Sequence, residues 1–135
     1  MAVPIRDLRS REISELPRNG TKTFRFRGVH ATDLTSGEMV DVLGPVDLAR
    51  YGSCTFEFTD RETGVLRTAQ GLCLLVSEEN GAAVDRELRV VSTRLVEQLH
   101  ADLESGAYRK TRYTIEGVGE PPKTRYGIPT RELVG

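Results

Sequence analysis

The chain has 135 residues, of which 38% are hydrophobic and 29% are charged, a composition typical of a globular protein. This length predicts one domain with its own core and excludes two domains of ordinary size. No apolar run approaches the length of a membrane-spanning helix, and the N-terminus lacks the basic and apolar segments of a secretory signal. We therefore expect a cytoplasmic protein without a membrane segment.

Charge is distributed unevenly along the chain, although the net charge is only −1. Residues 1–31 carry seven Arg or Lys against three Asp or Glu, residues 32–105 carry six against fourteen, and residues 106–135 carry six against three. The two ends are thus basic and the middle is acidic. Sixteen of the nineteen cations are arginine, which suits phosphate contacts, although a GC-rich genome produces the same bias.

Residues 1–19 are expected to form an N-terminal arm or a short helix. Apolar residues recur there at loosely helical spacing, and the Pro17–Gly20 segment then breaks the pattern. Residues 20–135 are expected to form a single domain. Its first strand runs from Thr21 to His30, because apolar and polar residues alternate there.

In this first strand Phe24 and Phe26 are predicted to point into the core, and Arg25 and Arg27 to point outward. A long connection follows over residues 31–50, with turn signals on both sides of a short strand at residues 39–43.

A hairpin is predicted next. Residues 51–59 alternate, with Cys54, Phe56 and Phe58 expected in the core, and residues 60–64 supply the turn. The returning strand starts near Val65, and the apolar run at residues 72–76 suits a buried strand. The two cysteines are expected to behave as small buried hydrophobes.

Residues 82–91 allow two interpretations. The Asn80-Gly81 pair is a strong hairpin-turn signal, so these residues would return as a strand. Apolar residues at near-helical spacing from Val84 to Leu103 allow instead one long helix. We favour the strand, with a helix that begins at Ser92 or Thr93 and ends at Gly106, because β-branched residues 90–91 precede two capping residues.

The last predicted element is a hairpin. The four residues Lys-Thr-Arg-Tyr occur at 110–113 and again at 123–126, on either side of a Gly- and Pro-rich loop. With the loop centred between residues 119 and 120, Tyr113 falls opposite Tyr126. The other face then carries four cations, Lys110, Arg112, Lys123 and Arg125. Such a face suits a polyanion or is simply solvated.

These elements predict a mainly β fold with one helix, of the α+β class. Their order is that of a partly open oligonucleotide/oligosaccharide-binding (OB) barrel with a long first connection and an extra strand or hairpin.

Four segments carry a family resemblance: residues 56–60, 92–99, 113–119 and 124–128. With them, residues 51–130 resemble small single-stranded-DNA-binding proteins of phages and other mobile elements, which serve as accessories in DNA replication or recombination. The resemblance implies an OB fold and sequence-tolerant, non-catalytic binding of single-stranded DNA or RNA. The chain lacks the acidic tail with which bacterial single-strand binders recruit partners, so that role is not implied.

Under this resemblance a groove of cations tracks the phosphates, and aromatic faces stack on the bases. The charge would come from the last hairpin and be extended by Arg25 and Arg27 of the first strand. Two tyrosines at strand edges are candidates for stacking or for packing. The candidate nucleic-acid-binding residues are Arg25, Arg27, Tyr51, Tyr108, Lys110, Arg112, Lys123 and Arg125.

No catalytic, metal or cofactor site is expected. Two cysteines and two scattered histidines make no zinc pattern, and no glycine-rich phosphate loop opens a helix. The alternative function is that of a phage or mobile-element structural or adaptor protein. Its basic ends would meet the acidic middle of another copy in a homo-oligomer, or it would bind another protein.

Overall fold

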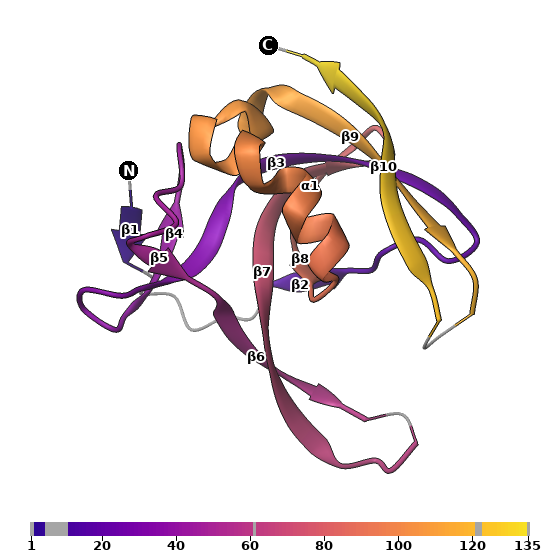
Figure 1. The fold of residues 1–135 in the computed structure, drawn as a ribbon, viewed down its shortest axis with the longest axis horizontal. Coiled ribbons are helices and arrows are strands. Elements are labelled where there is room, and N and C mark those ends of the chain that lie inside the picture. The colour runs from indigo at the N-terminus through magenta and orange to yellow at the C-terminus, as the bar shows by residue number, and fades with distance from the viewer. Residues whose placement is uncertain (1, 5–10, 61, 121–122, 135) are drawn as a thin grey trace.

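The computed structural model describes residues 2–4, 11–60, 62–120 and 123–134, and Figure 1 shows their arrangement. The strands are β1 (Ala2–Pro4), β2 (Glu12–Ser14), β3 (Gly20–Asp33), β4 (Met39–Val42), β5 (Tyr51–Gly52), β6 (Cys54–Thr59), β7 (Leu66–Glu79), β8 (Ala82–Val90), β9 (Thr111–Val118) and β10 (Arg125–Leu133). An α-helix, α1 (Thr93–Ser105), and a 3-10 helix, η1 (Ala107–Lys110), lie between β8 and β9. The expected mainly β fold with one α-helix is confirmed.

The long strand β3 organises the sheet. Along one edge it pairs with β7 and, near its end, with β5; along the other, its first half pairs with β9 and its second half with β4, all antiparallel. Strand β7 also pairs with β8, and β9 with β10. The sheet is mixed, because β2 runs parallel to β8. It does not close, since within the described residues β8 and β10 do not pair.

The core lies between the inner face of this sheet and α1, which crosses in front of the strands in Figure 1. The alternation of β3 buries Phe24 and Phe26 completely, as predicted, with ring centroids 6.0 Å apart. From the other side, α1 contributes Leu95, Leu99 and Leu103, which follow one another at four-residue spacing on one helix face.

The boundaries of α1 are the predicted ones. The Ser92 side chain accepts a hydrogen bond from the backbone N–H of Leu95, which satisfies one of the free donors of the first turn. Gly106 ends the helix with φ of 85°. Asn80 and Gly81 both have positive φ, 50° and 82°, as the predicted tight turn requires, so residues 82–90 form a strand and not a helix.

Of the two N-terminal alternatives, the short helix is wrong where the structure describes that segment, because residues 12–14 form a strand, whereas the arm stays a prediction. Pairing with β8 satisfies the backbone of β2, and Ser14 donates a hydrogen bond to Glu79 at 2.6 Å. Strand β1 pairs with β4. Residues 5–10 of the predicted N-terminal arm or helix lie outside the described residues.

The β6–β7 hairpin extends beyond the rest of the sheet, at the bottom of Figure 1. The prediction that Phe56 and Phe58 belong to the core is therefore wrong: Phe56 is half-buried, and Phe58 is 43% exposed. Alternation placed them on one face, but no described layer covers that face at the end of the hairpin. Of the described helices, none is long and apolar enough to cross a membrane.

Candidate functional site

The last hairpin forms, but in another register from the predicted one. Tyr126 lies opposite Gly117, and Tyr113 lies opposite Arg131 after an irregularity between residues 127 and 130. The predicted Tyr113–Tyr126 pair is therefore wrong. The cause is a wider loop, held at its start by Asn19, whose side-chain oxygen accepts a hydrogen bond from the backbone N–H of Gly119 at 2.8 Å.

The predicted face of four cations does not form. Lys110 ends η1, and Lys123 lies in the loop between β9 and β10. Only Arg112 and Arg125 are on strands, where the register gives them the same outer face. The sequence repeat therefore does not gather its cations on one surface.

Arg112 and Arg25 belong to an electrically neutral row across four strands, in the order Glu132, Arg112, Arg25 and Glu78. The Arg112 guanidinium contacts Glu78 at 3.0 Å and Glu132 at 3.4 Å. Beside it, the Nε of Arg25 is buried and bonds to no described residue. Two acids thus balance two cations, and this row presents no net charge to a phosphate chain.

The remaining predicted residues have different environments. Arg27 forms an ion pair with Asp85 at 3.6 Å. Tyr108 is completely buried and its hydroxyl donates to the Gly44 carbonyl at 2.7 Å, so its prediction as a stacking residue is wrong. Burial also raises the pKa of Tyr108 to about 12. Tyr51 is half-buried, with the Arg50 guanidinium 5.3 Å from its ring centroid.

The basic ends of the chain pair with its acidic middle inside one molecule. Ion pairs join Arg11 to Asp41, Lys22 to Glu79, Arg27 to Asp85, Arg112 to Glu78 and Arg131 to Asp102. These ion pairs neutralise much of the charge of the basic and acidic segments, which could otherwise attract a polyanion or another copy of the chain. The uneven charge of the sequence is thus largely balanced by ion pairs within the molecule.

A groove of about 440 Å³ opens between α1 and the strand ends near β5. Its lining is mostly apolar and includes Tyr51, Leu72 and Val96, with polar groups from Gln70 and His100. Its size is that of a small-molecule site. No arginine or lysine is among the described residues that line it, so the groove itself offers no phosphate contact.

The outer face of the projecting hairpin carries aromatic rings beside guanidinium groups. Phe58 lies opposite Arg67, and two residues along the strand Phe56 lies opposite Ala69, so all four side chains share this face. Arg89 of β8 places its guanidinium 4.9 Å from the Phe56 ring centroid. We call Phe56, Phe58, Arg67 and Arg89 the aromatic platform.

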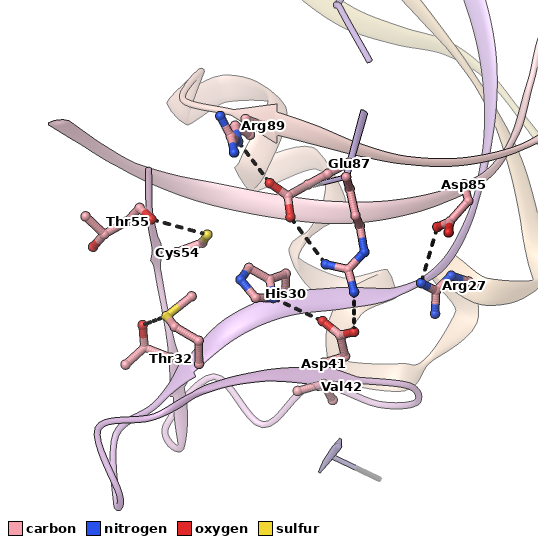
Figure 2. A network of polar contacts seen from close by, with 12 residues as sticks. Arg27, His30, Thr32, Asp41, Val42, Cys54, Thr55, Asp85, Glu87 and Arg89 are labelled. Carbon is pink, nitrogen blue, oxygen red and sulfur yellow. Dashed lines mark hydrogen bonds and ion pairs between the residues drawn. The ribbon is translucent and has the colours of Figure 1, made fainter. Parts of the chain in front are cut away.

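A buried polar network continues from the platform across the same outer face (Figure 2). One row of paired residues crosses β4, β3, β7 and β8 in the order Asp41, His30, Cys73 and Arg89. Figure 2 shows His30 at the centre, where its Nδ1 lies 3.0 Å from Asp41 Oδ1.

Arginines on both sides complete this network. Arg11 contacts Asp41 at 2.6 Å and Glu87 at 3.8 Å, and Arg89 contacts Glu87 at 2.9 Å. Arg89 therefore links the buried carboxylate of Glu87 to the aromatic platform. Burying charges is costly unless each is paired, and here every carboxylate has an arginine or histidine partner.

The network changes the acid–base properties of its members. Burial alone lowers the pKa of His30, but interactions with Asp41, Cys54 and Glu87 outweigh it and raise that pKa to about 9. The neighbouring Cys73 thiol, together with His30, lowers the pKa of Cys54 to about 6 against the effect of burial. The same thiol contact and burial raise the pKa of Cys73. The surroundings of Cys54 and His30 thus shift each of them toward its charged form.

Neither the platform nor the network was predicted as a site. Alternation correctly gave Cys54, Phe56 and Phe58 one common face, which was the available signal, but it could not tell a buried face from an exposed one. The partnership of His30 with Asp41 depends on the pairing of β3 with β4 across the turn at residues 34–38. In the described part of the chain, no three His, Cys, Asp or Glu side chains are placed to hold a metal ion.

Comparisons with known proteins found no match among family models, curated proteins or solved structures. Function is therefore inferred from the geometry of this chain alone.

Proposed function

We propose that this chain is a non-catalytic binding domain for single-stranded nucleic acid, with little sequence preference, and that bases stack on the aromatic platform. The fold supports this as an OB-like arrangement. The strands β3, β7 and β8, then α1, then β9 and β10 follow in the order of that barrel, and β3 pairs with both β7 and β9. OB folds bind oligonucleotides on the face of their second and third strands and on the loop that precedes the second.

The observation that carries the proposal is the exposure of Phe58 on that same face. Its ring is 43% exposed on a hairpin that belongs to the connection between β3 and β7, and Phe56 and Arg89 continue the surface onto β8. An exposed aromatic ring beside guanidinium groups is the element on which a base stacks. Base stacking on such a ring contributes about 1–3 kcal/mol per base and tolerates any base.

The cations of this surface are few, so the interaction would depend more on stacking than on charge. Arg67 is 54% exposed and already contacts Asp60 at 3.0 Å. If Arg67 and Arg89 each neutralise one phosphate, the slope of log affinity against log salt would be about −1.4. This is about half the slope that a four-cation face would produce.

The test is fluorescence anisotropy of a labelled oligothymidylate and a labelled oligoadenylate with the wild-type protein and the Phe58→Ala variant. We expect both strands to bind at low salt and Phe58→Ala to weaken both by about 5- to 150-fold, the equivalent of one stacked base. Leu133→Ala is the matched control, because Leu133 is 75% exposed on β10, away from the platform. A folded wild-type protein with no affinity for either strand would refute the proposal.

The second candidate is a protein-binding or self-assembling module, and a separate observation favours it. Val65 and Leu66, at the end of the same hairpin, are 53% and 61% exposed. Apolar side chains at a projecting tip suit a protein partner or another copy of this chain. A homo-oligomer that Leu66→Asp dissociates, in a protein that binds no oligonucleotide, would place this candidate first.

A further inference from the structure

Two thiols lie side by side in the buried network. Cys54 is opposite Gly71 of β7, and Cys73 follows two residues later on the same face, so the cysteines are diagonal neighbours on paired strands. His30 lies directly opposite Cys73 on the next strand. Both thiols are buried, at 3% and 0% exposure.

The charged groups around this pair come from every strand that packs on it. Strand β4 contributes Asp41, which holds the His30 ring, and β8 contributes Glu87 and Arg89. Arg11 joins the two carboxylates from the N-terminal segment. These partners favour an imidazolium at His30, next to Cys54.

The acid–base properties agree with this arrangement. The Cys73 thiol, as a hydrogen-bond donor, lowers the pKa of Cys54 to about 6 together with His30, whose own pKa is raised to about 9. The opposite directions of the two shifts favour deprotonation of Cys54 before Cys73. Reactive cysteines are distinguished by this kind of electropositive setting.

The groove beside α1 approaches the pair at the edge of the sheet. The groove is lined by His30 and Cys73, and by Gly52 and Ser53, which directly precede Cys54. Cys54 is the first residue of β6, and Ser53 lies outside the strands. Both thiols are buried, so a small reagent in the groove reaches them only when the start of β6 opens locally.

We propose that Cys54 is a nucleophilic thiol that exchanges with low-molecular-weight disulfides, and that Cys73 resolves the product into an intramolecular disulfide. The inference is independent of the proposed nucleic-acid binding. It makes this face a site of reversible thiol oxidation.

The reaction balances with glutathione disulfide as the oxidant. The Cys54 thiolate attacks one sulfur, the disulfide bond of the reagent breaks, and the departing glutathione thiolate takes the proton held by His30. The Cys73 sulfur then attacks Cys54 in the mixed disulfide, and its proton passes to the second departing glutathione. Two protein thiols are oxidised, and one glutathione disulfide is reduced to two glutathione molecules.

Ring closure needs a small movement of the strands. Diagonal neighbours have Cα atoms about 7–8 Å apart, whereas a disulfide joins Cα atoms about 4.4–6.8 Å apart. This shift requires the start of β6 to move, which the β5–β3 pairing and the hydrogen bond from the Thr32 hydroxyl to the Ser53 carbonyl resist. We therefore expect the second step to be slower than the first, so that the mixed disulfide is detectable.

The test is mass spectrometry of the folded protein after incubation with glutathione disulfide at neutral pH. We expect the loss of two hydrogen atoms from the intact mass and a peptide containing the Cys54–Cys73 link. Cys73→Ser should trap one glutathione at Cys54, and Cys54→Ser should form no intramolecular disulfide and at least tenfold less adduct. Reaction only in urea, or equal labelling of both cysteines, would overturn the proposal.

A pH profile separates this role from simple accessibility. In wild-type protein, the rate of iodoacetamide labelling at Cys54 should reach half its maximum near pH 6, and His30→Gln should move this midpoint upward. Here His30 both favours the Cys54 thiolate and supplies a proton to the departing thiolate, and circular dichroism checks that the variant is folded. An unchanged midpoint near that of free cysteine in both proteins would contradict the assignment.

Discussion

Tyr108 shows how a single side chain contributes to the stability of the core. Its ring fills the core and its hydroxyl satisfies the Gly44 carbonyl, in the connection between β4 and β5. Such a carbonyl would otherwise be buried without a partner. Tyr108 is therefore a structural residue.

Replacing Tyr108 with Phe should lower the free energy of unfolding by about 1–3 kcal/mol, because the Gly44 carbonyl loses its donor. Urea denaturation measures this difference. Tyr126→Phe is the control, since Tyr126 is half-buried and its hydroxyl bonds to no described residue. Equal effects of the two substitutions would contradict this role for the hydroxyl.

The Cys54–His30 pair predicts an unusual dependence of stability on pH. The pKa of His30 rises from its ordinary 6.5 to about 9, so its contribution is complete below 6.5 and is lost as pH rises through 9. The pKa of Cys54 falls from 9.0 to about 6, so its contribution is complete above 9.0 and is lost as pH falls through 6. Between pH 6.5 and 9 the two slopes have opposite signs and cancel.

Cys54→Ser should remove this cancellation. The variant keeps the Asp41 hydrogen bond to His30, so its stability should still fall as pH rises above 6.5, by at most about 1.4 kcal/mol per pH unit. This fall should end below pH 9, because Cys54 itself helps to raise the pKa of His30. The wild-type protein should show a much flatter profile from this pair. Urea denaturation at several pH values measures both, and parallel profiles would show that the thiolate–imidazolium pair does not form.

At the scale of elements, α1 depends on its first cap. Ser92→Ala removes the acceptor for the Leu95 N–H and should cost about 1 kcal/mol of unfolding free energy. Ser53→Ala is the control, because Ser53 is exposed and its hydroxyl bonds to no described residue. Urea denaturation of both variants measures the difference in the free energy of unfolding. A decrease no larger than that of Ser53→Ala would show that the Ser92 cap does not stabilise α1.

The β6–β7 hairpin is predicted to be separable from the core. None of the buried core residues lies between Glu57 and Thr68, which face each other across the hairpin. Joining them through an Asn-Gly turn should leave the fold intact and abolish oligonucleotide binding. Circular dichroism and anisotropy test the two parts separately, and full binding by a folded shortened chain would exclude the platform.

Local signals explain which elements could be predicted from the sequence. The alternation in β3, the Ser92 cap, the Gly106 terminus and the Asn80-Gly81 turn each act over a few residues, so the sequence alone identified them. The register of β9 with β10 depends on the loop conformation and on Asn19, which is far away in sequence. Strand β2 exists because β8 offers an edge to it, and no local pattern records that.

The same distinction applies to the candidate site. The sequence identified the arginines but not their partners, because Arg25, Arg112 and Glu78 meet only through strand pairing. It also identified one face that carries Cys54, Phe56 and Phe58, but not that the hairpin extends past the core. Exposure of Phe58 is a consequence of tertiary structure.

At the scale of the whole molecule, internal charge pairing determines what the surface can bind. Basic segments at both ends of the chain contact acidic strands in its middle, so they form no continuous basic groove. Under the proposed function, nucleic acid would bind through stacking supported by a few cations. This is why the proposed surface is an aromatic platform and not the last hairpin.

The most direct measurement is a two-dimensional NMR titration of the ¹⁵N-labelled protein with a short oligothymidylate at low salt. The account predicts that backbone signals of residues 54–58, 67–71 and Arg89 shift in proportion to the bound fraction. Signals of residues 123–133 should stay in place. Shifts confined to β9 and β10, or no shifts at all at saturating concentrations of a folded protein, would contradict the proposed surface.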